Sequence, residues 1–262
     1  MPGISRLPNT PPSNAAIERH SLGVRTLHWL GTLSFGTLLF SGVVILMCHP
    51  RLYWGDVGND LTPALIELPI SRNHQHSGWT QEEPFFEHKS SPYSAGRTFE
   101  IFNQNSWGRS LHFLAAWGFV FTGISYYWFG MTSGHFRFNL LPFGKQLTWK
   151  VFWDELKAHL RLEVRDPTGG PQYGLLQRIA YLFVLFLLVP LSLVTGLAMS
   201  PAITASYPFL SEIFGGFQSA RTIHFFVSVA LALFLAVHVL MVVRSGFLKQ
   251  MRAMTVGLKD EK

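Results

Sequence analysis

Apolar residues gather in four long stretches of this chain, each of which contains no Asp, Glu, Lys or Arg. The stretches are apolar on every helical face, whereas a soluble amphipathic helix keeps one polar side. A helix needs about 20 such residues to cross a hydrocarbon core of roughly 30 Å. The pattern therefore predicts four membrane-spanning helices, at Leu27–Met47, Ser110–Phe129, Ile179–Met199 and Thr222–Val243.

The segments between these spans are polar and differ in character. Residues 48–107 are turn-rich with little periodicity, which predicts an irregular cap on one membrane face. Residues 130–174 contain "LTWKVFWDELKAHLRLEV", whose apolar and charged residues fall on opposite sides of a helix, as in helices that lie in the headgroup plane. The fold class is thus an all-α membrane protein, with a polar tail at 1–26, a four-helix transmembrane bundle over 27–247 that includes the cap and an interfacial helix, and a second tail at 248–262.

Composition supports this class and adds an orientation. Hydrophobic residues make up 48% of the 262 positions and charged residues only 14%. With both termini in the cytoplasm, that side holds 15 of the 21 Lys and Arg, which is the excess expected of cytoplasmic loops. Residues 48–107 then lie on the periplasmic side. The net charge of +6 reflects topology and contact with anionic lipid, and gives no reason to expect nucleic acid as a partner.

Four of the eleven histidines lie inside the predicted spans: His28, His112, His224 and His238. An ionisable side chain in a bilayer is costly and marks a candidate functional site, although a hydrogen bond between helices explains a single histidine equally well. His238 follows His224 by fourteen residues, about 21 Å along a helix and near the same face. Because successive spans alternate in direction, depth pairs His28 with His238 at the inner side and His112 with His224 at the outer side.

Two imidazole pairs, each from two helices, suit two bis-histidine haems. Zinc needs further Cys or carboxylate ligands, and a proton relay or ion pathway places Asp, Glu or Lys within spans; these spans have neither. Cys48 is the only cysteine, which excludes covalent C-x-x-C-H attachment and a cysteine-ligated iron–sulfur cluster. The pattern predicts two non-covalent b-type haems.

Arginine precedes three of these histidines by three residues, in "RTLH", "RSLH" and "RTIH". Because i and i+3 share a helix face, Arg25, Arg109 and Arg221 are expected one turn nearer the water, where a haem propionate would emerge. Alternatively, arginine simply marks the membrane boundary. Gly42 and Gly123 lie near the ligand face at the depth of the other haem, where a porphyrin needs room, although glycine is common in membrane helices.

Longer motifs occur in order along all four spans: "RTLHW", "RSLHFLAAWGFVFTG", "GHFR", "PQYGLLQRIAY", "VTGLAMSP" and the H-x13-H of the last span. In these the chain resembles the four-span di-haem cytochrome b subunits that anchor formate dehydrogenases, nickel–iron hydrogenases and thiosulfate reductases. The resemblance implies a bacterial cytoplasmic-membrane subunit that carries respiratory electrons between a periplasmic oxidoreductase, often molybdenum-containing, and the quinone pool. The family's ligand pattern falls on the same four histidines.

The identity of the partner stays open at this stage. The outer segment from His49 to Trp107 is longer than in the formate dehydrogenase members. In "GRSLHFLAAW" and "GHFRFNLLP" the chain instead resembles family members that look like partners of sulfite-oxidase-type molybdenum proteins. The chain has no molybdopterin, dinucleotide or nucleotide fingerprint and no Ser/His/Asp arrangement, so no catalytic residue is assigned. Substrate chemistry is expected in the partner.

Quinone, as the exchangeable substrate, is expected to react at the inner face beside the haem of His28 and His238. The amphipathic helix offers a Trp-bearing apolar entry, and donors for a quinone carbonyl are available nearby. These candidates are His20, His135, Arg137 and Asn139. The same residues also suit a simple charge anchor.

A second function class is a stand-alone membrane haem oxidase or reductase that passes electrons between quinone and a small periplasmic oxidant. A haem-free sensor or transporter fits the in-span histidines poorly. A gene for a catalytic oxidoreductase beside this one would support the subunit reading, and an isolated gene the stand-alone enzyme.

Overall fold

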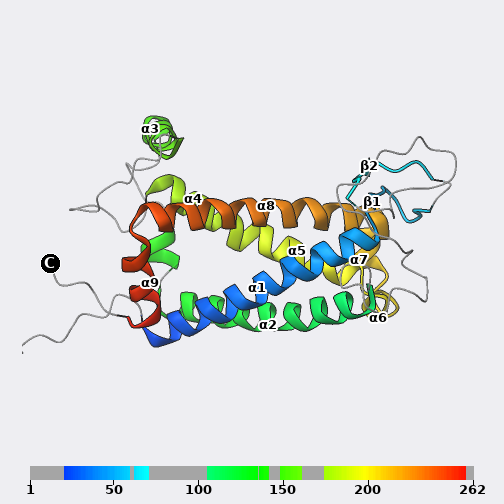
Figure 1. Cartoon of the computed structure of the whole chain (residues 1–262), viewed down its shortest axis with the longest axis horizontal. Coiled ribbons are helices and arrows are strands. Elements are labelled where there is room, and N and C mark those ends of the chain that lie inside the picture. The colour runs from blue at the N-terminus through cyan, green and yellow to red at the C-terminus, as the bar shows by residue number, and fades with distance from the viewer. Residues whose placement is uncertain are drawn as a thin grey trace, which may run out of the picture.

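The structure is a computed structural model that describes residues 21–59, 62–70, 105–134, 136–141, 148–160 and 174–257. Its long helices lie side by side along one axis (Figure 1). They are α1 (Leu22–Cys48), α2 (Asn105–Thr132), α8 (Phe217–Arg244), and a helix composed of α4 (Leu175–Phe183), the π-helical η6 (Val184–Leu188) and α5 (Val189–Ala198).

Three of these helices are long and apolar enough to cross a membrane: α1, the continuous helix from Leu175 to Ala198, and α8. The chain is therefore a helical membrane protein, as the hydrophobic pattern predicts. α2 has the required length of 28 residues but a lower hydropathy, because Trp, Tyr, Ser and Gly make up much of its sequence. The fourth span stays a prediction.

The helix at the third predicted span is interrupted by a π-helical turn just before Pro190. Proline has no backbone N–H, so the Leu185 carbonyl, which in this register faces position 190, lacks a backbone donor. Tyr127 of α2 donates its hydroxyl to that carbonyl. This bond gives the Leu185 carbonyl the donor that it lacks in its own helix, and it joins α2 to η6.

The helices pack in two ways. Between α1 and α2, glycines allow close approach: an added methyl group would come within 2.8 Å of Ser34 Oγ at Gly118, and within 2.9 Å of Val44 Cγ1 at Gly108. Small residues are the usual means by which membrane helices approach closely. η6, α5 and α8 instead share an aliphatic core, whose buried members are Leu188, Val189, Val227 and Leu231.

One end of the bundle, here called the α9 end, holds the start of α1 and the end of α8 (Figure 1). There α9 (Phe247–Thr255) turns off α8 at Gly246, whose φ of 97° favours glycine. Trp29 Nε1 donates to the Met254 carbonyl and Arg25 Nη1 to the Thr255 carbonyl, each at 3.0 Å. Carbonyls in the last turn of a helix lack backbone donors, so α1 caps α9. The sequence pattern did not single out this helix.

The amphipathic segment forms α3 (Trp149–Leu160) within the expected Leu147–Val164, of which residues 147 and 161–164 lie outside the described ones. It is viewed almost end-on in Figure 1, so its axis crosses that of the long helices. Glu155 Oε2 accepts the N–H of Leu176 at 2.8 Å, a first-turn donor that α4 itself cannot satisfy. This bond fixes α3 to the bundle. Its place in the headgroup plane stays a prediction.

The opposite end, here called the β end, holds the end of α1 and the start of α8 (Figure 1). A two-residue β pair forms there, with β1 (Arg51–Leu52) antiparallel to β2 (Ile66–Glu67). Thr222 Oγ1 donates to the Tyr53 carbonyl at 2.6 Å, and the Gly55 N–H donates to Ser219 Oγ at 2.7 Å. The start of the expected cap is thus tied to α8, and residues 71–104 lie outside the described ones. Shorter elements complete the described chain: η4 (Phe136–Leu140), α6 (Pro201–Thr204) and α7 (Phe209–Glu212).

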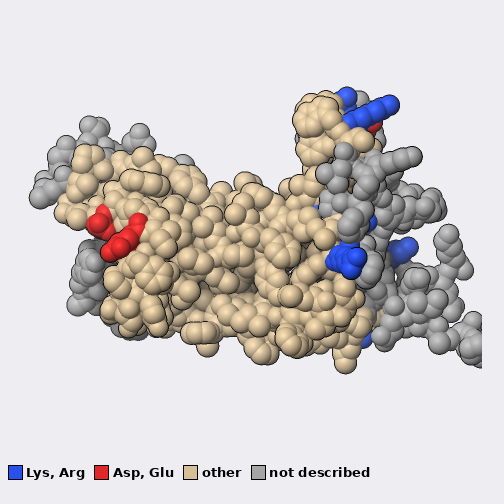
Figure 2. Space-filling model, turned by 180° about the vertical axis from the view of Figure 1, so that it is seen from behind, with Lys and Arg blue, Asp and Glu red and all other residues tan. Residues whose placement is uncertain are grey.

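Charge divides the bundle by its ends (Figure 2). The described cations at the α9 end are Arg25, Arg137, Lys150, Lys157, Arg178, Arg244, Lys249 and Arg252, against the acids Asp154 and Glu155. Those at the β end are Arg51, Arg109 and Arg221, balanced by Asp56, Glu67 and Glu212. This asymmetry has the sense expected if the α9 end faces the cytoplasm.

Candidate functional site

Two of the four in-span histidines face each other near the β end. His112 on α2 and His224 on α8 have ring centroids 6.3 Å apart and planes inclined by 67°. Two imidazoles on opposite sides of one metal atom, with nitrogen–metal bonds of about 2 Å, would have centroids roughly 6 Å apart. The spacing therefore suits a single iron between the rings, which His112 and His224 would hold.

Each of these rings has a hydroxyl group from a neighbouring helix at its Nδ1 atom. Ser41 Oγ on α1 lies 2.9 Å from His112 Nδ1, and Thr195 Oγ1 on α5 lies 3.0 Å from His224 Nδ1. The Ser192 carbonyl also lies 3.0 Å from His224 Nδ1. Bonding at Nδ1 fixes the orientation of a ring and leaves Nε2 to bind a metal, which is the usual arrangement of ligating histidines.

The donor set is that of a histidine pair and not of a multi-ligand metal centre. Within the part of the chain that the structure describes, no group of three or more His, Cys, Asp or Glu could hold a metal ion. A structural zinc site needs four such ligands and a catalytic site three. The residues present therefore fit a bis-histidine haem better than zinc.

The other two in-span histidines lie toward the α9 end, His28 in the first turns of α1 and His238 in the last turns of α8. The His28 ring meets Trp29 edge-on at 5.4 Å, and the His238 ring stacks on Phe234 at 6.2 Å and 21°. The structure thus brings both histidines to one end of the bundle, and their pairing about one iron stays a prediction.

Comparison with known proteins shows the family to which the chain belongs. The family model described as prokaryotic cytochrome b561 matches residues 19–257. The chain belongs to the prokaryotic cytochrome b561 family. A similar protein is the putative protein-methionine-sulfoxide reductase subunit YedZ1 of Azospira oryzae, 30% identical over 168 residues that make up 63% of this chain and 78% of that protein. No solved structure matches the chain.

Membership of the cytochrome b561 family confirms the resemblance found in the motifs. Proteins of this family are membrane cytochromes that bind b-type haem, so the chain is a membrane haem protein of the electron-transfer kind.

Two of the three arginines that precede the histidines have hydrogen-bond partners in the protein. Arg25 donates to the end of α9, as described above, and Arg221 Nη2 donates to the carbonyls of His49 and Arg51. Arg109 is exposed at the start of α2. Two of the three guanidinium groups therefore fasten loops or helix ends, which the sequence did not reveal, and contact with a propionate stays a prediction.

His49 follows the last residue of α1 and lies among these cations. Burial, together with the positive charges of Arg221, Arg109 and Arg51, lowers the pKa of its imidazole to about 4. His49 is therefore neutral near pH 7. The positive charge of this cluster comes from the arginines alone.

The predicted room for a porphyrin can be tested at two glycines. At Gly42 an added methyl group would lie 3.7 Å from His112 Cε1, so this glycine lies at the outer depth, as expected. At Gly123 an added methyl group would meet nothing within 4 Å among the described atoms. Both positions keep space beside or between the helices that carry the histidines.

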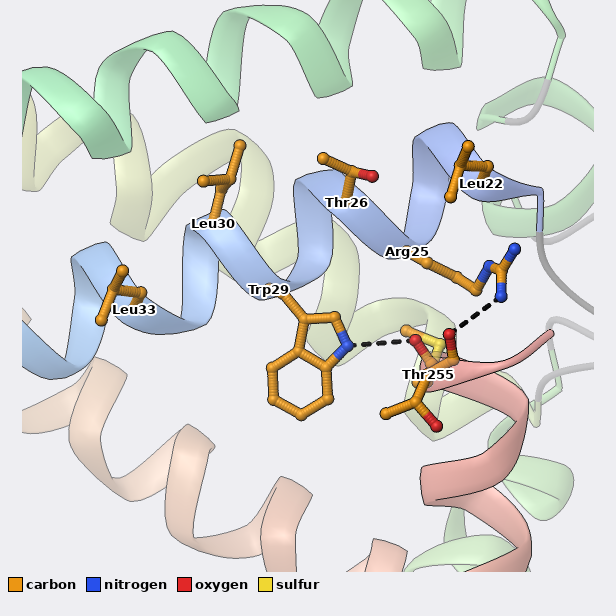
Figure 3. Close-up of a pocket in the computed structure, with 8 residues that line it drawn as sticks. Leu22, Arg25, Thr26, Trp29, Leu30, Leu33 and Thr255 are labelled. Atoms are coloured by element: carbon orange, nitrogen blue, oxygen red, sulfur yellow. Dashed lines mark hydrogen bonds between the residues drawn. The ribbon is translucent and has the colours of Figure 1, made fainter.

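An open cavity of about 380 Å³ lies at the α9 end between α1 and α9 (Figure 3). Trp29, which contacts His28, forms part of its wall, and both Trp29 and Arg25 reach toward the end of α9. The cavity thus begins one residue from a predicted haem ligand. Its wall consists of Leu22, Arg25, Thr26, Trp29, Leu30, Leu33, Met254 and Thr255.

The residues predicted to bind quinone are only partly placed. Arg137 is exposed on η4 and does not line this cavity. Asn139 belongs to the same π-helical turn. His20 and His135 lie outside the described residues. Trp29 is not among the residues predicted from the sequence, although "RTLHW" places a tryptophan directly after an in-span histidine near the membrane boundary, where amphipathic rings are common.

Proposed function

We propose that this cytochrome is a di-haem membrane subunit that carries electrons across the cytoplasmic membrane between a periplasmic oxidoreductase and the quinone pool. The observation that carries the proposal is the pair His112 and His224, whose rings face each other at a distance suited to one iron. In this proposal the pair holds an outer b haem near the β end. His28 and His238 hold an inner b haem near the α9 end.

The residues of the chain would hold and separate the two groups. α8 supplies one ligand to each, and the fourteen residues between them span about 21 Å of helix, which places the haems one above the other through the membrane. A bound b haem takes up and releases one electron at its iron. The apolar helices exclude water from the path between the two sites.

The orientation and the partner are proposed together. The cation-rich α9 end would face the cytoplasm, all four helices would cross the bilayer, and the β end would face the periplasm. The relative from Azospira oryzae is named as a subunit of a putative protein-methionine-sulfoxide reductase. This name, together with the sulfite-oxidase-type resemblance of the motifs, supports a periplasmic molybdenum oxidoreductase as the partner.

Purification from native membranes tests this function. We expect about two b haems per chain by pyridine haemochrome assay, because four ligands make two axial pairs. A catalytic oxidoreductase should co-purify and be identified by mass spectrometry. One haem or none per chain would contradict the di-haem claim. Two haems with no partner would instead support a stand-alone oxidase or reductase.

We further propose that quinone reacts at the α9 end, in the cavity beside Trp29. The cavity is within the usual size range of small-molecule sites, about 300–1,000 Å³, and is lined mainly by apolar side chains with one guanidinium. A quinone analogue should therefore shift the spectrum or potential of the inner haem and leave the outer haem unchanged. Optical redox titration with and without the analogue measures this.

Two tryptophan substitutions, one in the cavity and one outside it, test where the quinone binds. Replacing Trp29 with alanine should raise the KM for quinol several-fold while both haems remain bound, because the cavity loses one wall. Trp117 is 72% exposed on α2 and does not line the cavity, so Trp117→Ala serves as the control. Perturbation confined to the outer haem, or equal effects of the two substitutions, would place the quinone elsewhere.

A further inference from the structure

We infer that Ser41 and Thr195 are positioning residues for the outer haem, because their hydroxyl groups hold His112 and His224 with the proton on Nδ1. The inference rests on the proposed function, since it takes the two histidines as axial ligands. It concerns which nitrogen of each imidazole ring carries the proton, and the hydrogen bonds determine this.

For His112 the argument starts from the hydroxyl of Ser41. Ser41 Oγ lies 2.7 Å from the Thr37 carbonyl and 3.2 Å from the Leu38 carbonyl, and a hydroxyl has a single proton to donate. With that proton on a carbonyl of its own helix, Ser41 Oγ can only accept from His112 Nδ1 at 2.9 Å. His112 therefore donates through Nδ1.

For His224 two acceptors lead to the same assignment. Thr195 Oγ1 donates to the Leu191 carbonyl at 2.7 Å, so it too is left as an acceptor for His224 Nδ1. The Ser192 carbonyl, 3.0 Å from the same nitrogen, has no proton to give. A neutral imidazole carries one N–H, and here it lies on Nδ1. The lone pair is on Nε2.

The two hydroxyl residues share a local sequence pattern, because each is followed by glycine. Gly42 comes directly after Ser41, and Gly196 directly after Thr195. An added methyl group would lie 3.7 Å from His112 Cε1 at Gly42 and 3.6 Å from His224 Cε1 at Gly196. Two helices thus present the same device, in which the hydroxyl accepts Nδ1–H and the glycine makes room for the ring edge.

Such an arrangement has two consequences for a bound haem. Each ring is already neutral with a free Nε2 lone pair, so ligation requires no loss of a proton. The Nδ1–H bond also makes the ring a stronger donor to iron, which favours the ferric state. Removing an acceptor should therefore raise the midpoint potential of the outer haem.

The test uses Ser41→Ala and Thr195→Val in the full-length membrane protein. We expect a higher midpoint potential for the outer haem and a changed ferric low-spin EPR signal, with content and potential of the inner haem unchanged. Ser41→Thr and Thr195→Ser keep the hydroxyl and should restore both properties. Thr37→Val is the matched control, because its hydroxyl bonds to Leu33 of its own helix and to no histidine.

The outcomes separate this inference from the function on which it rests. An outer haem with wild-type potential and EPR signal in both Ser41→Ala and Thr195→Val would overturn the positioning role and leave the di-haem function standing. An equal shift in Thr37→Val would also overturn it. If His112→Ala and His224→Ala removed no haem, the proposed function itself would fail.

Discussion

Replacing His112 or His224 with alanine is expected to remove the outer haem and leave the inner haem bound. In the proposed function each ring would supply one of the two protein ligands of this haem. The facing rings lie 6.3 Å apart, and no group of three or more metal-binding side chains occurs among the described residues. The haem content should fall from about two to about one per chain, because only one iron loses a ligand. Haemochrome assay and redox titration, with loss of one spectral component, measure this.

A histidine outside the spans controls for this experiment. His49 lies at the same end of the bundle and is not a predicted ligand, so His49→Gln should retain both haems. Comparison of His28→Ala with His112→Ala tests the pairing by depth directly. If His28→Ala and His112→Ala abolished the same spectral component, that pairing would be wrong.

Replacing His28 or His238 with alanine is expected to have the opposite effect, with loss of the inner haem and retention of the outer one. Quinol-dependent electron transfer should then fall to the background rate, because the proposed inner haem would lie beside the Trp29 cavity. An artificial periplasmic reductant should still reduce the outer haem. Stopped-flow spectroscopy at the outer haem band, with each donor in turn, separates the two effects.

Phe234 provides the matched control at the α9 end. Its ring stacks on His238 but cannot ligate iron, so Phe234→Leu should keep both haems and most of the quinol activity. Quinol oxidation at the wild-type rate in a protein that lacks the inner haem would contradict the proposal. It would place the quinone site at the β end.

Much of the membrane architecture was predictable because it depends on local sequence. An uninterrupted apolar run specifies a spanning helix whatever it packs against. The bilayer core holds no water to bond the backbone N–H and C=O groups, so these must bond to one another within a helix. The three most apolar helices begin and end within a few residues of their predicted bounds. α2 is as long as α8, but aromatic and small residues lower its hydropathy. Hydropathy therefore does not identify α2 as a membrane span, as it does the other three helices.

The sequence by itself determined where the histidines lie along their helices, because the helical rise converts sequence separation directly into distance along a helix axis. It also determined the family, through motifs that span the chain. The meeting of His112 with His224 followed from depth and alternating helix direction, and the facing rings agree with it.

Only the tertiary structure decided what lies around each ring and each arginine. Ser41 and Thr195 meet histidines 71 and 29 residues away, and Arg25 and Arg221 meet carbonyls at distant helix ends and loops. Periodicity fixes the face of a residue on its own helix, but not the rotation of that helix against its neighbours. That rotation depends on the packing of all the helices together, such as the close approach of α1 and α2 at Gly118.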